Sequence, residues 1–267
     1  MNKNRQIDIM GIVNLTDDSY FSASRCASPS QAVVLASRLV DEGASILDFG
    51  ACSTRPGAAP VGAEEEWRRL RPALEAVRKE FPDACISVDT YWSDVVRRTY
   101  DAIGDFVVND ISAGEDDPQM LPLVGSLGLR YVAMHKRGTP QTMQSMTDYE
   151  DVTTAVADYF TDFAERAGLA GVRDWILDPG FGFAKTLEQN YQLMRDLSRF
   201  KVAFPSRKLL VGVSRKSMVY RLLEITPEES LPATQVLHLH ALQNGADILR
   251  VHDVAQAVQA VSLYRML

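Results

Sequence analysis

Eight short apolar segments, each followed closely by polar side chains, constrain the fold of this 267-residue chain more than any other feature. The segments span residues 7–13, 45–49, 85–88, 106–108, 130–134, 175–177, 209–213 and 248–251. Most of them lack a two-residue alternation and are rich in Val, Ile and Leu. Such near-continuous apolar runs are typical of strands that are buried in a parallel sheet.

Segments with helical periodicity lie between these runs. Ser28 followed by Pro29 marks the start of one predicted helix, which Gly43 ends. Further helices are predicted over residues 63–81, 152–167, 187–200, 232–244 and 253–267, with a less regular one after Asn109. A strand followed by a helix, eight times over, predicts an α/β fold: a single (β/α)₈ TIM barrel that forms one domain over residues 1–267.

An open doubly wound sheet is the alternative α/β fold, but the strand count favours the barrel. The glycine-rich stretch at Gly180 and Gly182 lacks the third glycine of a dinucleotide-binding fingerprint.

Composition narrows the functional class. The net charge of −7 argues against a nucleic-acid partner, since such proteins usually carry a basic field. The cysteines, Cys26, Cys52 and Cys85, form no CxxC pair, which favours a reducing, cytoplasmic compartment. The longest stretch without Asp, Glu, Lys or Arg, residues 230–246, contains several polar residues, so no membrane span is predicted.

Polar side chains recur where each predicted strand ends. In a barrel these positions share the C-terminal rim, where active sites are built, so the recurrence predicts an enzyme. The rim residues are Asn14, Ser53, Thr54, Arg55, Asp89, Asn109, His135, Asp178, Ser214, Arg215, Lys216, Arg250 and His252.

The rim residues divide into two chemical groups. Amide and carboxylate side chains suit a flat heterocycle rich in N–H and C=O groups, and cationic ones suit phosphate. Together they indicate a planar polar ligand that carries phosphate. Structural roles are the alternatives: Asp89 as the cap of the next helix, Arg250 in an ion pair with Asp253, and Asp178 in a turn.

Eight motifs on the eight predicted strand ends identify a resemblance. They are Met10-Gly-Ile-Val-Asn-Leu-Thr16, Ser53-Thr-Arg-Pro-Gly57, Ser87-Val-Asp-Thr90, Asn109-Asp-Ile-Ser112, Met134-His-Lys-Arg-Gly-Thr-Pro140, Asp178-Pro-Gly-Phe-Gly-Phe183, Gly212-Val-Ser-Arg-Lys-Ser217 and Arg250-Val-His-Asp253. From about Ile9 to Leu267, the chain resembles the dihydropteroate synthases, a family of pterin-binding barrel enzymes of folate biosynthesis.

The resemblance implies that p-aminobenzoate condenses with 6-hydroxymethyl-7,8-dihydropterin pyrophosphate to give 7,8-dihydropteroate and pyrophosphate, with Mg²⁺ on the pyrophosphate. Asn14 would bind the metal. By the same resemblance, Asp89, Asn109, Asp178 and Lys216 would bind the pterin, Arg55, Arg250 and His252 the pyrophosphate, and Thr54, Pro56, Phe183 and Ser214 the p-aminobenzoate. Asp89, Lys216, Arg250 and His252 would be the catalytic residues.

The family also implies sulfonamide inhibitors and a homodimer formed through C-terminal helices. One alternative is a methyltetrahydrofolate-dependent corrinoid methyltransferase of the same fold, although the cations at the rim favour the synthase. Another is a non-catalytic pterin-binding paralogue, because Asp17 stands where the family's first loop usually has proline. A third is an unrelated phosphate-binding barrel enzyme.

We expect Asp178→Asn to abolish pterin binding while the fold stays intact, because an amide cannot accept two N–H hydrogen bonds from the pterin as a carboxylate can. Calorimetric titration with a pterin, beside circular dichroism of the variant, checks this. Unchanged pterin affinity would contradict the role given to Asp178.

Overall fold

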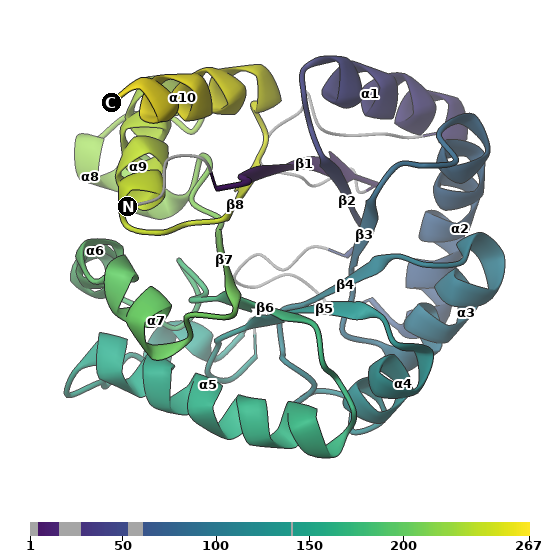
Figure 1. Cartoon of the computed structure of the whole chain (residues 1–267), viewed down its shortest axis with the longest axis horizontal. Helices are drawn as coiled ribbons and strands as arrows, with labels where there is room; N and C mark the ends of the chain where they lie inside the picture. The colour runs from purple at the N-terminus through teal and green to yellow at the C-terminus, as the bar shows by residue number, and fades with distance from the viewer. Residues whose placement is uncertain (1–4, 16–27, 53–60, 140) are drawn as a thin grey trace.

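Eight parallel strands close into one barrel in chain order, as predicted (Figure 1). The computed structural model describes residues 5–15, 28–52, 61–139 and 141–267. The strands are β1 (Asp8–Asn14), β2 (Ile46–Gly50), β3 (Ile86–Asp89), β4 (Val107–Asp110), β5 (Arg130–Met134), β6 (Trp175–Asp178), β7 (Lys208–Val211) and β8 (Ile248–Val251). Because β8 pairs with β1, the sheet closes on itself.

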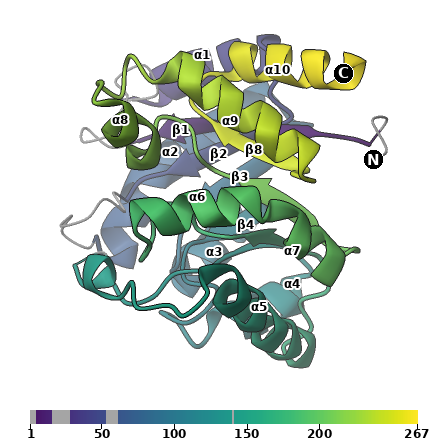
Figure 2. The same cartoon turned by 90° about the vertical axis from the view of Figure 1, so that its left-hand side faces the viewer.

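Helices surround the barrel in both views (Figures 1 and 2). They are α1 (Pro29–Asp41), α2 (Ala63–Glu80), α3 (Ser93–Ile103), α4 (Met120–Leu127), α5 (Val152–Leu169), α6 (Leu187–Arg195), α7 (Leu197–Ala203), α8 (Ser217–Leu223), α9 (Leu231–Gln243) and α10 (Val254–Met266), with a 3-10 turn at Met143–Ser145. The predicted cap of α1 is confirmed, since Ser28 accepts a hydrogen bond from the amide of Gln31.

One helix boundary was predicted wrongly. Residues 187–200 do not form a single helix, because the backbone leaves the helical region at Asp196, where ψ is 7°. The Asp196 carboxylate accepts a hydrogen bond from the hydroxyl of Thr153, 2.8 Å away on α5. Helices α3 and α8 were not predicted, and α8, with seven residues, is too short to show a periodicity.

Side-chain alternation along the strands divides the barrel interior into layers. An apolar cluster inside the barrel takes one residue from each of seven strands: Met10, Ile46, Val107, Val132, Ile176, Leu210 and Ile248. Two residues further along, the same inward face carries polar groups on four strands: Asp48, Asn109, Asp178 and Arg250. The apolar layer thus closes the barrel beneath a polar layer at the C-terminal ends of the strands.

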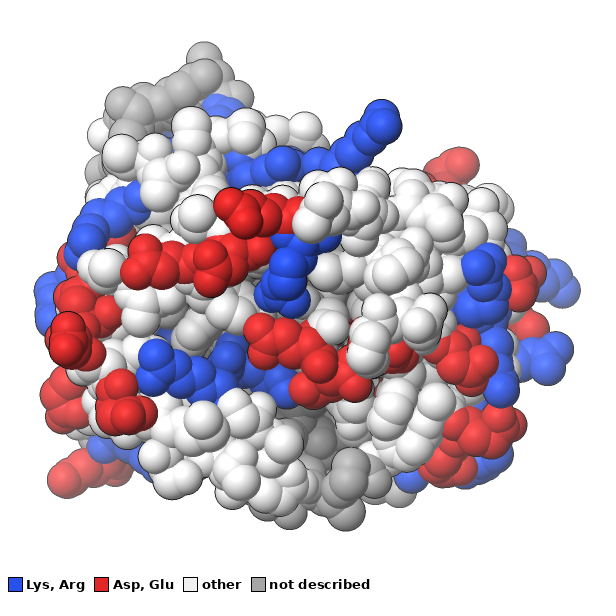
Figure 3. Space-filling view, turned by 90° about the horizontal axis from the view of Figure 1, so that it is seen from below, with Lys and Arg blue, Asp and Glu red and all other residues white. Residues whose placement is uncertain are grey.

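The outer surface carries charges of both signs. On the face in Figure 3, Lys and Arg side chains lie interleaved with Asp and Glu side chains. Among the helices of the described residues, none has both the length and the apolar character needed to cross a membrane.

Close packing between α4 and the end of α5 yields a stability prediction. A Cβ on Gly125, inside α4, would overlap the carbonyl oxygen of Ala170, the residue that ends α5. We expect Gly125→Ala to lower the free energy of unfolding by roughly 1–3 kcal/mol, the usual cost of overpacking. This loss would occur even though alanine favours helix by about 1 kcal/mol over glycine.

Gly168→Ala is the matched control, because Gly168 lies inside α5 and a Cβ there would face open space. It should be neutral or raise the free energy of unfolding by up to about 1 kcal/mol. Urea unfolding followed by tryptophan fluorescence measures both variants. If Gly125→Ala were as stable as Gly168→Ala, the predicted overlap would be wrong.

Candidate active site

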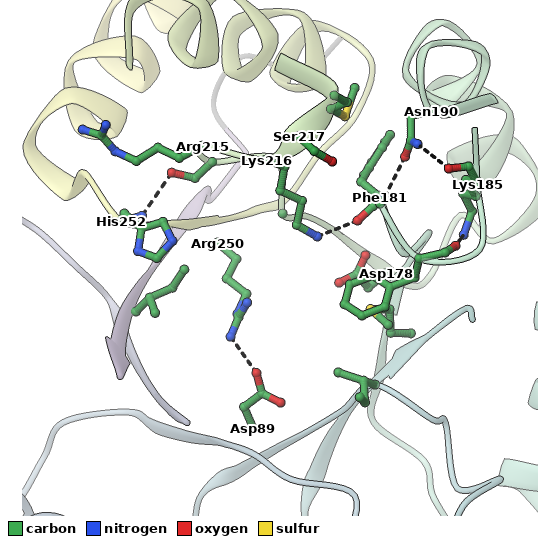
Figure 4. A pocket seen from close by; sticks show the side chains of 18 of the residues that line it. Asp89, Asp178, Phe181, Lys185, Asn190, Arg215, Lys216, Ser217, Arg250 and His252 are labelled. Atoms are coloured by element: carbon green, nitrogen blue, oxygen red, sulfur yellow. Dashed lines mark hydrogen bonds and ion pairs between the residues drawn. The ribbon is translucent and has the colours of Figure 1, made fainter. Parts of the chain in front are cut away.

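A cavity of about 590 Å³ opens at the C-terminal ends of the strands (Figure 4). It brings together nine of the residues that the sequence predicted for the site: Asn14, Asp89, Asn109, Asp178, Phe183, Ser214, Lys216, Arg250 and His252. The other three predicted site residues, Thr54, Arg55 and Pro56, lie outside the described residues, as does Asp17.

Arg250 connects two carboxylates in this cavity. Its Nε donates to Asp48 and its Nη2 donates to Asp89, each at 2.7 Å, and Figure 4 shows the guanidinium pointing at Asp89. Burial raises the pKa of Asp89 above its usual range, and the charge of Arg250 opposes that rise. The positive charge of Arg250 is therefore balanced by the protein before any ligand binds.

The capping role considered for Asp89 is contradicted, and the ion pair considered for Arg250 exists with other partners, Asp48 and Asp89. Asp89 does not cap the next helix, because the residue before α3 is Trp92. Asp253 does not pair with Arg250 but with Arg215, through two hydrogen bonds of 2.8 Å.

Arg215 and Lys216 are neighbours in sequence with different roles. The Arg215 guanidinium is bound by Asp253 and by the carbonyl groups of Pro227 and Glu228, so it fastens the segment between α8 and α9. In Figure 4 the side chain of Lys216 instead points towards Phe181 and Asp178. Of these two basic rim residues, Lys216 is thus the one that offers its charge to the cavity.

Lys216 is a half-buried residue whose ammonium group lies at the wall of the cavity. Its Nζ donates to the carbonyl oxygen of Phe181 at 2.6 Å and lies 4.9 Å from the ring centre of Phe183. Burial lowers the pKa of Lys216 to about 8, and the nearby Asp178 carboxylate opposes this. Burial also raises the pKa of Asp178, which accepts a hydrogen bond from the amide of Gly180 at 2.8 Å.

His252 lies beside Arg250 at the end of β8, and its backbone amide donates to the hydroxyl of Ser214 at 3.2 Å. Burial, with help from the positive charges of Arg250 and Arg215, lowers the pKa of His252 to about 3. The imidazole is therefore neutral at physiological pH. It offers a ligand a hydrogen bond rather than a positive charge.

Lys185 is a buried residue of the cavity wall that the sequence analysis missed. Its ammonium donates to the carbonyl oxygens of Gly180 and Phe183, each at 2.9 Å, and lies 3.0 Å from Nδ1 of His135. Gly180 has a φ of +72°, and a Cβ there would overlap the His135 carbonyl. Lys185 and Gly180 thus fix the loop that carries Phe183. His135 packs against Lys185 and helps to hold this loop.

The second missed residue is Asp48. Its carboxylate is completely buried and accepts hydrogen bonds from Arg250, Asn109 and Ser87. Inward alternation from Ile46 would have predicted its position, because Asp48 is two residues further along β2.

The predicted metal ligand, Asn14, lines the cavity together with Gly50 and Asp89. Gly50 separates Asn14 from Asp89 across the sheet, and a Cβ on Gly50 would lie 3.8 Å from Asn14 Oδ1 and 3.9 Å from Asp89 Oδ2. The described residues contain no group of three or more His, Cys, Asp or Glu that could hold a metal. These side chains fit Mg²⁺, which commonly takes one or two protein oxygens and completes its shell with water and substrate phosphate.

A protein-family model and a characterised relative both match this chain over most of its length. A family model described as pterin binding enzyme matches residues 10–252. The dihydropteroate synthase of Escherichia coli is 40% identical over 255 residues, which cover 95% of this chain and 89% of that protein.

Two solved structures are also similar over the whole chain. The Yersinia pestis dihydropteroate synthase in complex with a sulfonamide drug superposes with a TM-score of 0.92 at 36% identity, and 95% of it is covered. The Xanthomonas albilineans dihydropteroate synthase with 4-aminobenzoic acid gives a TM-score of 0.88 at 35% identity, with 94% covered.

Proposed function

The chain belongs to the dihydropteroate synthases of the pterin-binding enzyme family, and from this premise we propose how its cavity carries out their reaction. It is a transferase of folate biosynthesis, which joins p-aminobenzoate to 6-hydroxymethyl-7,8-dihydropterin pyrophosphate and releases pyrophosphate. The observation that carries the proposed residue roles is the convergence of acidic, amide and cationic side chains from different strands on one cavity.

The acidic half of the cavity holds the pterin in this proposal. Asp178, Asn109 and Asp89 line the cavity and offer hydrogen-bond acceptors to the N–H groups of the ring. Lys216, which already contacts the Phe181 carbonyl and lies near Asp178, donates a hydrogen bond to the ring. The arrangement orients the ring so that its methylene carbon faces the mouth of the cavity, where the second substrate enters.

The amine nitrogen of p-aminobenzoate forms a bond to that methylene carbon while the bond from the carbon to the pyrophosphate oxygen breaks. The electron pair leaves with pyrophosphate, and the new secondary amine loses a proton. As the leaving group departs, positive charge develops on the pterin, and the carboxylates of Asp89 and Asp178 at the cavity wall stabilise it.

Arg55, Arg250 and His252 bind the pyrophosphate in this proposal. Because two carboxylates already balance Arg250, and because His252 is neutral, both act mainly through directed hydrogen bonds. Asn14 would hold Mg²⁺, which would supply positive charge to the pyrophosphate.

Thr54, Pro56, Phe183 and Ser214 line the p-aminobenzoate site, which sulfonamides also occupy. The sulfonamide complex of the Yersinia relative supports this inhibitor class. We also place a homodimer interface on the C-terminal helices, supported by the exposed apolar side chains of Val236, Leu263 and Met266. A cytoplasmic location stays a prediction from the cysteine content.

The direct test combines the purified protein with dihydropterin pyrophosphate, p-aminobenzoate and Mg²⁺, and follows dihydropteroate by mass and pyrophosphate release. We expect Mg²⁺-dependent product, and a loss of about 100-fold or more in kcat/KM for Lys216→Ala. Lys208→Ala is the control, because Lys208 lies at the opposite end of the barrel in an ion pair with Asp8. Pterin binding without any product would support the non-catalytic alternative instead.

The pKa of Lys216 leads to a pH prediction. The ammonium form donates to the bound pterin, and its pKa in the free enzyme is about 8. Above pH 8, pterin affinity should therefore fall by roughly tenfold per pH unit. Calorimetric titrations between pH 6.5 and 9.5 measure this fall. Lys216→Ala should bind weakly without the alkaline fall, and an identical pH profile in both proteins would refute the assignment.

A further inference from the structure

We propose that Asp48 is a positioning residue. It fixes which side-chain atoms of the pterin pocket donate and which accept hydrogen bonds, an inference that rests on the proposed function. Asp48 lies on β2, beneath the cavity and fully buried, and it is absent from the residues that line the cavity. Two of its three hydrogen-bond partners, Asn109 and Arg250, do line the cavity. Asp48 therefore acts on a ligand only through these two side chains.

Asp48 decides which end of the Asn109 amide faces the ligand. An ionised carboxylate can only accept hydrogen bonds, so the side-chain nitrogen of Asn109 must point at it. That nitrogen lies 3.2 Å and 3.3 Å from the two oxygens of Asp48. The amide oxygen then points away from Asp48. The cavity consequently presents Asn109 as an acceptor, in addition to the acceptors on Asp89 and Asp178.

Asp48 also orients Arg250. The carboxylate holds Nε of the guanidinium at 2.7 Å, and the rigid, planar shape of that group then directs Nη2 at Asp89. With Asp48 in place, one arginine shares its charge between two carboxylates. Without it, Arg250 would lose one of its two anchors and could turn towards the ligand.

The neighbouring strand offers a matched control for burial. Asp110 follows Asn109 on β4 and is likewise a completely buried carboxylate. It accepts hydrogen bonds from Tyr131 Oη, from the hydroxyl and amide of Ser112 and from the amide of Gly114. None of these three partners is among the described residues that line the cavity. A merely structural role predicts similar consequences for the loss of either carboxylate.

The first experiment compares Asp48→Asn with Asp110→Asn in steady-state kinetics, pterin titration and thermal unfolding. For Asp48→Asn we expect the KM for dihydropterin pyrophosphate and the Kd for pterin to rise by roughly 10- to 100-fold. The KM for p-aminobenzoate, at saturating pterin substrate, should stay within about twofold. Asp110→Asn should lower the unfolding temperature and leave both KM values near wild type.

An exchange of the two side chains tests the polarity directly. In Asp48→Asn/Asn109→Asp the net charge is that of the wild type, and the amide at position 48 can donate to the carboxylate at position 109. In Asn109→Asp alone, two carboxylates face each other at positions 48 and 109, whereas the double variant again pairs a donor with an acceptor and keeps an acceptor towards the cavity. Pterin should therefore bind more tightly to the double variant than to Asn109→Asp alone. If Asp48→Asn does not fold, the exchange variant still gives this comparison.

Three results would overturn the inference, and the first two are an unchanged pterin KM in Asp48→Asn and equal losses in Asp48→Asn and Asp110→Asn. An exchange variant that binds pterin no better than Asn109→Asp would also overturn it. Wild-type protein assayed in parallel separates the two proposals. If the wild type binds and converts the pterin and Asp48→Asn behaves identically, only the role of Asp48 is refuted. If the wild type binds no pterin, the proposed function is refuted and the inference with it.

Discussion

Every second side chain of a closed barrel must point into its interior, and the chemistry of this protein depends on how that space is filled. Apolar residues from seven strands fill the lower part, so the polar layer above them has no access to water from below. A charged group in this layer needs an opposite charge and hydrogen bonds beside it. Arg250, held by Asp48 and Asp89, meets this need at the centre of the cavity.

The fold could be predicted almost completely from sequence, because strand segments and helical periodicity are local properties. The rim residues could be predicted for a related reason: in a parallel barrel, the position after each strand fixes the end of the barrel at which a residue lies. Asn14, Asp89, Asn109 and Asp178 reach one cavity on that basis alone. The break at Asp196 was missed because it depends on Thr153, more than forty positions away in sequence.

The direction in which a side chain points could not be predicted in the same way. Lys185 was missed because its role is to bind carbonyl groups of its own loop, and only the folded loop brings these groups around its ammonium. Asp48 was missed because it lies inside a strand and not after one. Asp253, named as one possible partner of Arg250 because it lies three positions along the chain, is bound by Arg215, and Arg250 pairs with the more distant Asp48.

The opposite orientations of Arg215 and Lys216 have a consequence for how variation in this protein family is interpreted. Arg215 uses the planar, forked geometry of a guanidinium to bind Asp253 and two carbonyl groups, whereas Lys216 places a single compact charge at the Phe181 carbonyl on the cavity wall. Two adjacent basic residues thus meet unrelated requirements, one for the packing of the chain and one for the proposed chemistry. A sequence profile that scores both positions only as "basic" would treat as neutral an exchange that neither position can accept.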